Sequence, residues 1–144
     1  MMQKEFFDLL HKTGLRVTPQ RIAICELLLN AKDHPTAGDI YDQLKSLYPS
    51  MSLATVYNTL EVLVQMGLVN SLGSVGDDMA HFDANLKPHI NLACNQCHRI
   101  TDFDSEQVGE LDLEIARKSG YQINGSSILY FGTCPDCQRK ISIN

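Results

Sequence analysis

The chain has 144 residues, of which 44% are hydrophobic and 20% are charged, a composition typical of one ordinary globular domain or two small ones. No run approaches the roughly 18 apolar residues of a membrane-spanning helix, and the charged N-terminus lacks the apolar core of a secretory signal, so we expect a cytoplasmic protein. The formal net charge is -5, and residues 1–84 carry six Lys or Arg against ten Asp or Glu. This balance lacks the basic footprint of most nucleic-acid-binding proteins, so DNA binding would need a local basic patch or a bound cation.

Four helices are predicted in the first part of the chain. The first covers residues 4–13, the second opens at Thr18-Pro19, the third opens at Thr36 and ends before Pro49, and the fourth covers 53–66. Thr18 and Ser52 are expected N-caps, and Thr36 with Asp39 resembles a capping box. Cys25 lies in the apolar stripe of the second helix and is expected to be a small buried residue.

The fourth helix has two different faces at 100° per residue. The expected core stripe is Leu53, Val56, Tyr57, Leu60, Leu63 and Val64, and the opposite side holds Thr55, Asn58, Val62 and Gln65, with Ala54 and Glu61 flanking. A helix, a short turn and this helix form a helix-turn-helix pattern, in which the second helix enters the DNA major groove.

A β-hairpin is predicted after these helices, from strands at 68–72 and 79–83 around a turn at 73–76. Helices followed by a hairpin indicate a winged helix-turn-helix DNA-binding domain over residues 1–84. The pattern also permits a small helical bundle with an unrelated hairpin.

A short linker at 85–88 precedes a small α/β domain over residues 89–144. Strands are predicted at 89–93, 100–103 and 128–132, and a helix at 105–119. Such a unit has exposed sheet edges and little core, so we expect it to be a dimerisation domain that extends its sheet in a homodimer.

Two Cys-x-x-Cys pairs, Cys94/Cys97 and Cys134/Cys137, are separated by 36 residues. Four thiolates form a complete tetrahedral set for a structural zinc ion. The alternatives are two disulfides, which need an oxidising compartment, or a redox pair, which usually comes singly. A closed four-cysteine site has no open coordination position, so it would support folding and not catalysis.

A second group of side chains suits a different metal. Its members are His34, His81, Asp83, His89, Asn91 and Asp102. Mixed imidazole and carboxylate sites suit Fe, Mn, Co, Ni or Zn. A metal there would clamp the two domains together. The alternative is a set of surface histidines and strand-end carboxylates.

Four motifs together resemble the ferric uptake regulator (Fur) family over nearly the whole chain. They are Arg16-Val17-Thr18-Pro19-Gln20-Arg21, His34-Pro35-Thr36-Ala37, Leu53-Ala54-Thr55-Val56-Tyr57-Asn58 and the two Cys pairs. The resemblance implies a dimeric, metal-responsive, winged-helix repressor.

Asp102 and Asn58 resemble the peroxide-responsive branch of that family, because iron-uptake members carry Glu and usually Arg there. By this resemblance the regulatory-metal ligands are His34, Asp83, His89 and Asp102, and the DNA-contacting residues are Arg16, Tyr57 and Asn58. Ala54 and Thr55, at the start of the same helix, are expected to lie at the DNA with them. The regulatory metal would be Fe2+ or Mn2+, and peroxide would oxidise His34 or His89.

Asn91 departs from the family pattern, which has His-x-His where this chain has His89-Ile90-Asn91. We expect Asn91 to be a regulatory-metal ligand through its amide oxygen, because strand alternation aims it at the same metal as His89. The alternatives are that the position is open or that His81 replaces the missing imidazole. His81 could also act indirectly or be a solvated strand residue.

We therefore predict a homodimeric repressor of palindromic operator DNA, with zinc at the four cysteines, and no enzyme. The alternative within the same class is a metal-uptake regulator that senses Fe2+, Zn2+ or Mn2+ without oxidation. No Ser or Cys nucleophile with a partnered base supports a hydrolase, and a zinc-binding adaptor would not bind a palindromic duplex.

Overall fold

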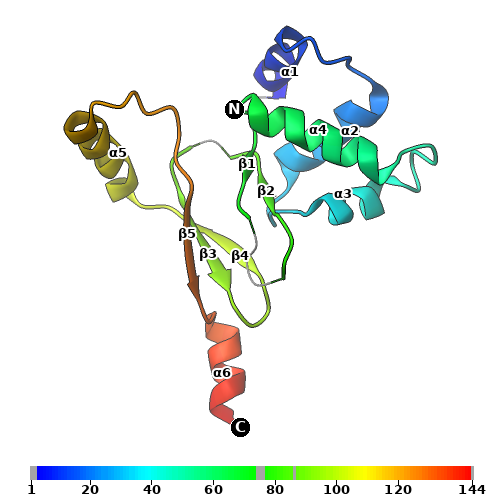
Figure 1. Cartoon of the computed structure of the whole chain (residues 1–144). Coiled ribbons are helices and arrows are strands. Elements are labelled where there is room, and N and C mark those ends of the chain that lie inside the picture. Colours follow the sequence, from blue (N-terminus) through cyan, green and yellow to red (C-terminus); the bar gives the residue numbers. More distant parts are fainter. Residues whose placement is uncertain (1–2, 74–76, 86, 144) are drawn as a thin grey trace. The chain divides into compact units, whose positions relative to one another are not determined.

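The computed structural model describes residues 3–73, 77–85 and 87–143 (Figure 1). The chain divides into two compact units. Unit 1 comprises Met1–Gly73 and Met79–Leu86, and unit 2 comprises Ser74–Asp78 and Lys87–Asn144. Most of the predicted hairpin turn at 73–76 lies outside the described residues. Among the helices that are described, none is long and apolar enough to cross a membrane.

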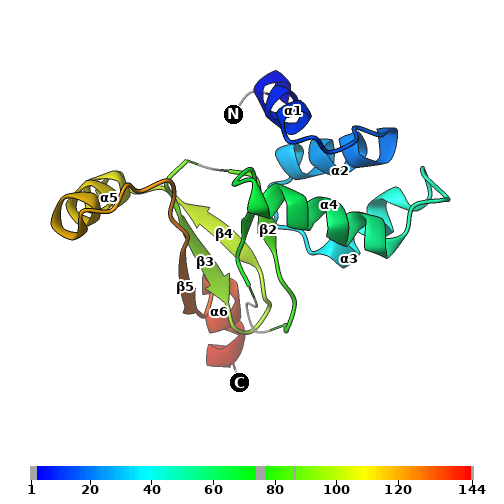
Figure 2. The same cartoon turned by 45° about the horizontal axis from the view of Figure 1, so that its top comes forward.

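Unit 1 is a winged helix-turn-helix. Its elements are α1 (Gln3–Lys12), α2 (Pro19–Asn30), α3 (Ala37–Leu44), α4 (Leu53–Gln65), β1 (Asn70–Ser71) and β2 (Phe82–Asp83). The core packs Ile24 of α2, Ile40 of α3 and Leu60 of α4 together, all at most 1% exposed. Figure 2 shows α2, α3 and α4 gathered beside the hairpin strands.

All three predicted N-caps of unit 1 are confirmed. The hydroxyl groups of Thr18, Thr36 and Ser52 each accept a hydrogen bond from the backbone N–H three residues later. Thr36 and Asp39 form a complete capping box, because the Asp39 carboxylate also accepts from the Thr36 backbone N–H at 3.0 Å. These bonds fix where α2, α3 and α4 begin, and so which residues lie at their first turns.

Two predictions about unit 1 are wrong, one about where α3 ends and one about which residues of α4 are buried. Helix α3 ends at Leu44 and not near Pro49, and Leu47 beyond it is 72% exposed. On α4, Leu53 and Tyr57 lie on the exposed face at 41% and 50%, whereas Thr59 is fully buried. Thr59 can be buried because its hydroxyl donates to the Thr55 carbonyl at 2.8 Å, which satisfies its polar group.

Unit 2 is built on a three-stranded sheet. The central strand β3 (Ile90–Cys94) pairs antiparallel with β4 (Ile100–Phe103) and parallel with β5 (Ile128–Gly132). A helix α5 (Glu106–Ser119) lies between β4 and β5 in the chain. A last helix, α6 (Pro135–Ile143), was not predicted, and it carries the second residue of the second Cys pair.

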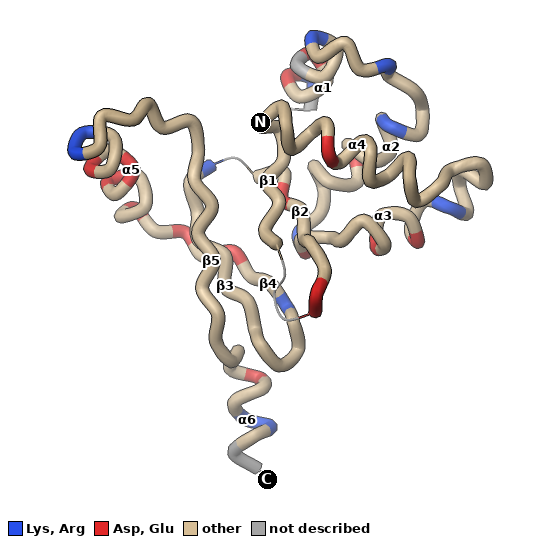
Figure 3. The backbone as a smooth tube through the Cα atoms, viewed as in Figure 1, with Lys and Arg blue, Asp and Glu red and all other residues tan. Residues whose placement is uncertain are grey.

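Helix α5 begins at the N-cap Ser105 and ends at Gly120, whose φ of 76° is the left-handed conformation that glycine accepts readily. It carries both acidic and basic side chains, with the basic ones in its last turn (Figure 3). Figures 1 and 2 show α5 apart from the sheet of its own unit. Val108 is its buried residue, whereas Leu111, Leu113 and Ile115 are 45%, 69% and 44% exposed. This helix therefore presents an apolar surface that its own unit leaves uncovered.

Candidate metal centres and DNA-facing helix

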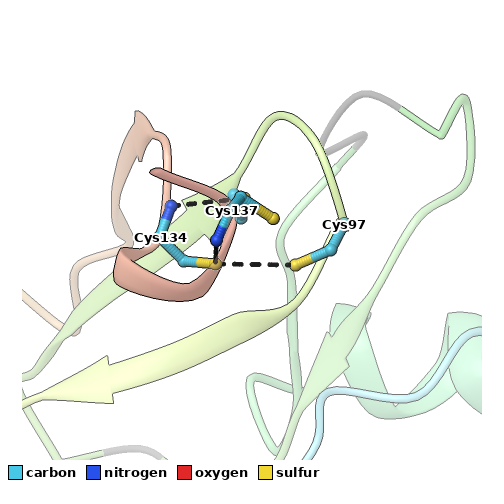
Figure 4. Close-up of side chains that lie close together, drawn as sticks. Cys97, Cys134 and Cys137 are labelled. Atoms are coloured by element: carbon cyan, nitrogen blue, oxygen red, sulfur yellow. Dashed lines mark hydrogen bonds between the residues drawn. The ribbon is translucent and has the colours of Figure 1, made fainter. Parts of the chain in front are cut away.

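The four paired cysteines of unit 2 lie together. Cys94 ends β3, Cys97 lies in the turn before β4, Cys134 follows β5, and Cys137 is in the first turn of α6. Their sulfur atoms all lie within 4.8 Å of one another, and all four thiols are free of disulfides. Figure 4 shows the Cys97 and Cys134 sulfurs facing each other, 3.9 Å apart. The β3–β4 turn and the α6 turn thus bring two distant Cys pairs to one point.

Backbone hydrogen bonds lower the pKa of two of these cysteines. Cys94 Sγ accepts from the backbone N–H of Cys134 at 3.3 Å and of Gln96 at 3.4 Å, and these donors lower the pKa of Cys94 to about 5. The backbone N–H of Cys137 lowers the pKa of Cys134, whereas the hydrogen bond to Cys134 raises the pKa of Cys137 to about 12. Four cysteine sulfurs at one point, with backbone N–H donors already aimed at two of them, form a site that fits a Zn2+ ion.

Arg99 is a charged neighbour of this site that sequence reasoning missed. Its Nη2 lies 3.5 Å from Cys134 Sγ and 3.0 Å from Asp136 Oδ2. Arg99 lowers the pKa of Asp136, so the two form an ion pair beside the sulfurs. Four thiolates around one Zn2+ carry two net negative charges, and a guanidinium here offsets part of them. By contrast, the lone Cys25 is fully buried, as predicted, and burial raises its pKa to about 12.

Among the residues that the structure describes, unit 1 holds an imidazole–carboxylate pair. His34 Nε2 lies 3.3 Å from Asp83 Oδ2, and the two side chains are only 4% and 8% exposed. The other carboxylate oxygen of Asp83 accepts from the Asn85 backbone N–H at 2.9 Å. The His34 imidazole and the Asp83 carboxylate, both predicted as ligands, therefore lie side by side within this unit.

Backbone contacts join the segment that carries His34 to the strand that carries Asp83. The Phe82 backbone N–H donates to the Pro35 carbonyl at 3.0 Å, and Thr36 forms a β-bridge with His81. The His81 side chain is buried, and its Nδ1 lies 2.7 Å from the His34 carbonyl oxygen, where it acts as the donor. His81 thus contacts the backbone of a candidate ligand.

Unit 2 holds a second imidazole–carboxylate pair. His89 Nε2 lies 3.8 Å from Asp102 Oδ1. His89 Nδ1 donates to the Lys87 carbonyl at 2.7 Å, which leaves the lone pair of Nε2 for another partner, the arrangement usual for a metal-binding histidine. Asn91 is the register partner of Asp102 across the β3–β4 ladder and is 2% exposed. The predicted ligands of this unit therefore lie on one face of its sheet.

The residues predicted to contact DNA fall on or near the exposed side of unit 1. Ala54, Tyr57 and Asn58 are exposed along α4, and Arg16 is exposed before α2. Thr55 is half-buried, and its hydroxyl lies 3.0 Å from that of the N-cap Ser52. Placing Tyr57 on this face corrects its assignment to the core stripe and leaves it free to contact a ligand.

The model of the ferric uptake regulator family matches this chain over residues 12–131. The chain belongs to the ferric uptake regulator family. Among its family relatives, the peroxide operon regulator of Bacillus subtilis is 39% identical over 137 residues, which cover 95% of this chain and 94% of that protein. The peroxide-responsive repressor PerR of Staphylococcus aureus (strain Mu50) is 36% identical over 131 residues, covering 91% and 88%. The resemblance to peroxide-responsive members is thereby confirmed.

Solved structures of Fur-family proteins share the fold. The ferric uptake regulator of Helicobacter pylori, described as having three functional metal-binding sites, superposes with a TM-score of 0.78 at 19% identity, covering 96% of this chain and 95% of that one. PerR from Streptococcus pyogenes, studied for peroxide sensing and gene regulation, has a TM-score of 0.54 at 35% identity, covering 93% and 91%. The winged helix followed by a small α/β unit with clustered cysteines is thus the fold of this family, as predicted.

Proposed function

We propose that this chain is a cytoplasmic, homodimeric repressor that binds palindromic operator DNA when a divalent cation is bound, and that peroxide releases it. The observation that carries the proposal is that each unit offers one imidazole–carboxylate pair, His34 with Asp83 and His89 with Asp102. The similarity to peroxide regulators supports the same conclusion.

We assign these two pairs to one regulatory cation. Two carboxylates balance a 2+ charge, and mixed imidazole and carboxylate donors suit Fe2+ or Mn2+. Because the donors come from both units, a cation shared by them would restrict how the DNA-binding unit is oriented. Orientation matters here because residues 1–84 are net acidic, so attraction to phosphates alone contributes little.

Unit 2 is the part that we expect to form the dimer. Its sheet ends in the edge strands β4 and β5, and the edge strand β5 carries Tyr130 and Phe131 at 60% and 58% exposed. The apolar surface of α5 is also uncovered. A second copy of the chain would bury both surfaces, and a twofold dimer would present two copies of α4 to the two halves of a palindrome.

Peroxide sensing would act through the imidazoles. His34, Asp83, His89 and Asp102 would hold Fe2+, which would catalyse the reduction of peroxide beside these ligands, with both electrons of the net reaction coming from the imidazole ring. In the net reaction one peroxide leaves one oxygen atom on the carbon between the two ring nitrogens of His34 or His89, and one water. The oxidised ring is a poorer ligand, so the cation and then the operator would be released. The four cysteines, which we assign to structural zinc, would take no part.

The test is operator affinity measured by fluorescence anisotropy, anaerobically, for the zinc-loaded chain with and without Mn2+. We expect Mn2+ to tighten binding of the wild type by at least roughly tenfold, and expect Asp83→Ala and Asp102→Ala to abolish that gain while keeping the zinc. Glu110→Gln, at an exposed acidic position of α5, is the matched control and should behave as wild type. Equal affinity with and without Mn2+ would refute the proposal.

A further inference from the structure

The loop between α1 and α2 presents Arg16, whose side chain is exposed and forms no ion pair with any described residue. Local hydrogen bonds fix the two ends of this loop. After α1, the Thr13 hydroxyl accepts from the Leu15 backbone N–H at 3.1 Å, and at the start of α2 Thr18 is the N-cap. The backbone of Arg16 lies between these two ends and takes part in neither bond.

Arg21, in the first turn of α2, makes the contact that holds the middle of the loop. Its Nη1 donates a hydrogen bond to the Arg16 carbonyl oxygen at 2.7 Å. Arg16 makes no other hydrogen bond with the part of the chain that the structure describes. Hydrogen bonds from a charged donor are roughly twice as strong as neutral ones. The backbone conformation at Arg16 therefore depends on the Arg21 guanidinium.

Packing alone does not explain an arginine at position 21. The side chain is half-buried, and its Nε is fully buried with no hydrogen-bond acceptor among the described residues. None of the described carboxylates forms an ion pair with its guanidinium. An aliphatic side chain would fill the same space without the cost of burying part of a charged group. A native protein usually retains such a group for a reason, and the bond to Arg16 supplies one.

The position of Arg16 matters because unit 1 has few positive charges. Residues 1–84 carry six Lys or Arg against ten Asp or Glu, so general attraction to phosphates is weak. Affinity for DNA then depends on a few well-placed contacts. An arginine on a loop loses conformational freedom when it binds a ligand, and a backbone that is already fixed reduces that cost.

We propose that Arg21 is a positioning residue for operator binding, which acts through Arg16 and does not itself contact the DNA. The Arg21 guanidinium fixes the Arg16 carbonyl, and thereby the direction in which the Arg16 side chain leaves the loop. This inference rests on the proposed function, because it assumes that the chain binds operator DNA with a divalent cation bound.

A double-mutant cycle tests whether Arg21 acts through Arg16. Operator affinity is measured by fluorescence anisotropy on the zinc-loaded full chain with saturating Mn2+, for the wild type, Arg21→Met, Arg16→Ala and the double variant. Each single substitution should weaken binding by roughly tenfold or more, as expected for the loss of a hydrogen bond from a charged group. The double variant should lie within roughly threefold of Arg16→Ala, because the two residues act as a unit. Lys32→Met, which removes an exposed positive charge from the same unit, is the control and should bind as the wild type does.

Three further readouts separate positioning from direct contact and from general stability. In the Arg16→Ala background, Arg21→Met should leave the salt dependence of operator affinity unchanged, whereas loss of a phosphate contact would reduce it. Hydrogen exchange in the α1–α2 loop should be faster in Arg21→Met, with exchange in α4 unchanged. Arg21→Lys keeps a charged donor and should bind the operator more tightly than Arg21→Met. If Arg21→Met does not fold, Arg21→Gln replaces it in every comparison.

The inference is overturned if Arg21→Met binds the operator as the wild type does while the wild type responds to Mn2+; the proposed function then stands and only the role of Arg21 is wrong. It is also overturned if the two losses multiply in the double variant, or if Arg21→Lys binds no better than Arg21→Met. If the wild type gains no operator affinity from Mn2+, the proposed function fails, and this inference fails with it.

Discussion

Thr36 links the start of α3 to the segment that presents His34, and replacing it with alanine is the most informative structural perturbation in unit 1. Its hydroxyl accepts from the Asp39 N–H at 3.1 Å, and its side chain is almost fully buried. Loss of an N-cap hydroxyl costs about 1 kcal/mol. Loss of the buried methyl group adds about 0.8 kcal/mol. Thr36→Ala should therefore destabilise α3 by about 2 kcal/mol, whereas Thr36→Ser keeps the cap and should lose only the methyl contribution.

Hydrogen exchange of the α3 amides, followed by mass spectrometry, measures this effect locally and does not require the whole chain to unfold in one step. A loss of 2 kcal/mol corresponds to exchange that is roughly 30-fold faster in Thr36→Ala, and Thr36→Ser should lie near the wild type, within roughly fivefold. Because Thr36 follows His34 by two residues, regulatory-metal affinity should fall in the same order. Equal acceleration in both variants would show that the hydroxyl does not cap α3, and would refute this reasoning.

Three further predictions concern other parts of the molecule. Gly120→Ala should destabilise unit 2 by about 1 kcal/mol in urea unfolding, because alanine is strained at a φ of +76° although an added Cβ meets nothing within 4 Å; an unchanged midpoint would contradict this. Arg99→Gln should speed zinc transfer to a chelator, since the guanidinium offsets thiolate charge, whereas Lys118→Gln in an exposed α5 ion pair should not. Asn58→Ala should weaken operator binding at least roughly tenfold with Mn2+ affinity intact, and an unchanged operator Kd would remove Asn58 from the interface.

Local signals in the sequence predicted the positions of most elements. The N-caps Thr18, Thr36 and Ser52 and the terminator Gly120 act through hydrogen bonds or backbone conformations within a few residues, so the sequence alone contains them. The clustering of the four paired cysteines was predictable for a similar reason, because each Cys-x-x-Cys pair places two sulfurs on one turn. Helix α6 was missed because the segment 135–143 is short and mostly polar, which gives only a weak apolar pattern.

The features that depend on tertiary neighbours could not be predicted. The apolar character of Tyr57 predicted that it lies in the core, but large apolar side chains are often exposed, as this one is. Thr59 is buried in the core instead, because its hydroxyl donates to the Thr55 carbonyl. Arg99 meets Asp136 from 37 residues away, through the convergence of a hairpin turn and a helix. Alternation predicted the face of Asn91, but its burial follows from the strands on either side of it.

The central claim is that this Fur-family protein is a metal-dependent repressor that peroxide inactivates through a histidine ligand. The most direct measurement combines operator anisotropy with peptide mass spectrometry on the same samples, the Fe2+-loaded and Mn2+-loaded forms, before and after peroxide is added anaerobically. The account predicts that only the iron form releases the operator, and that the released fraction equals the fraction carrying one added oxygen on His34 or His89. Release without oxidation of either histidine, or release that follows metal occupancy alone, would contradict it and identify a sensor of metal level.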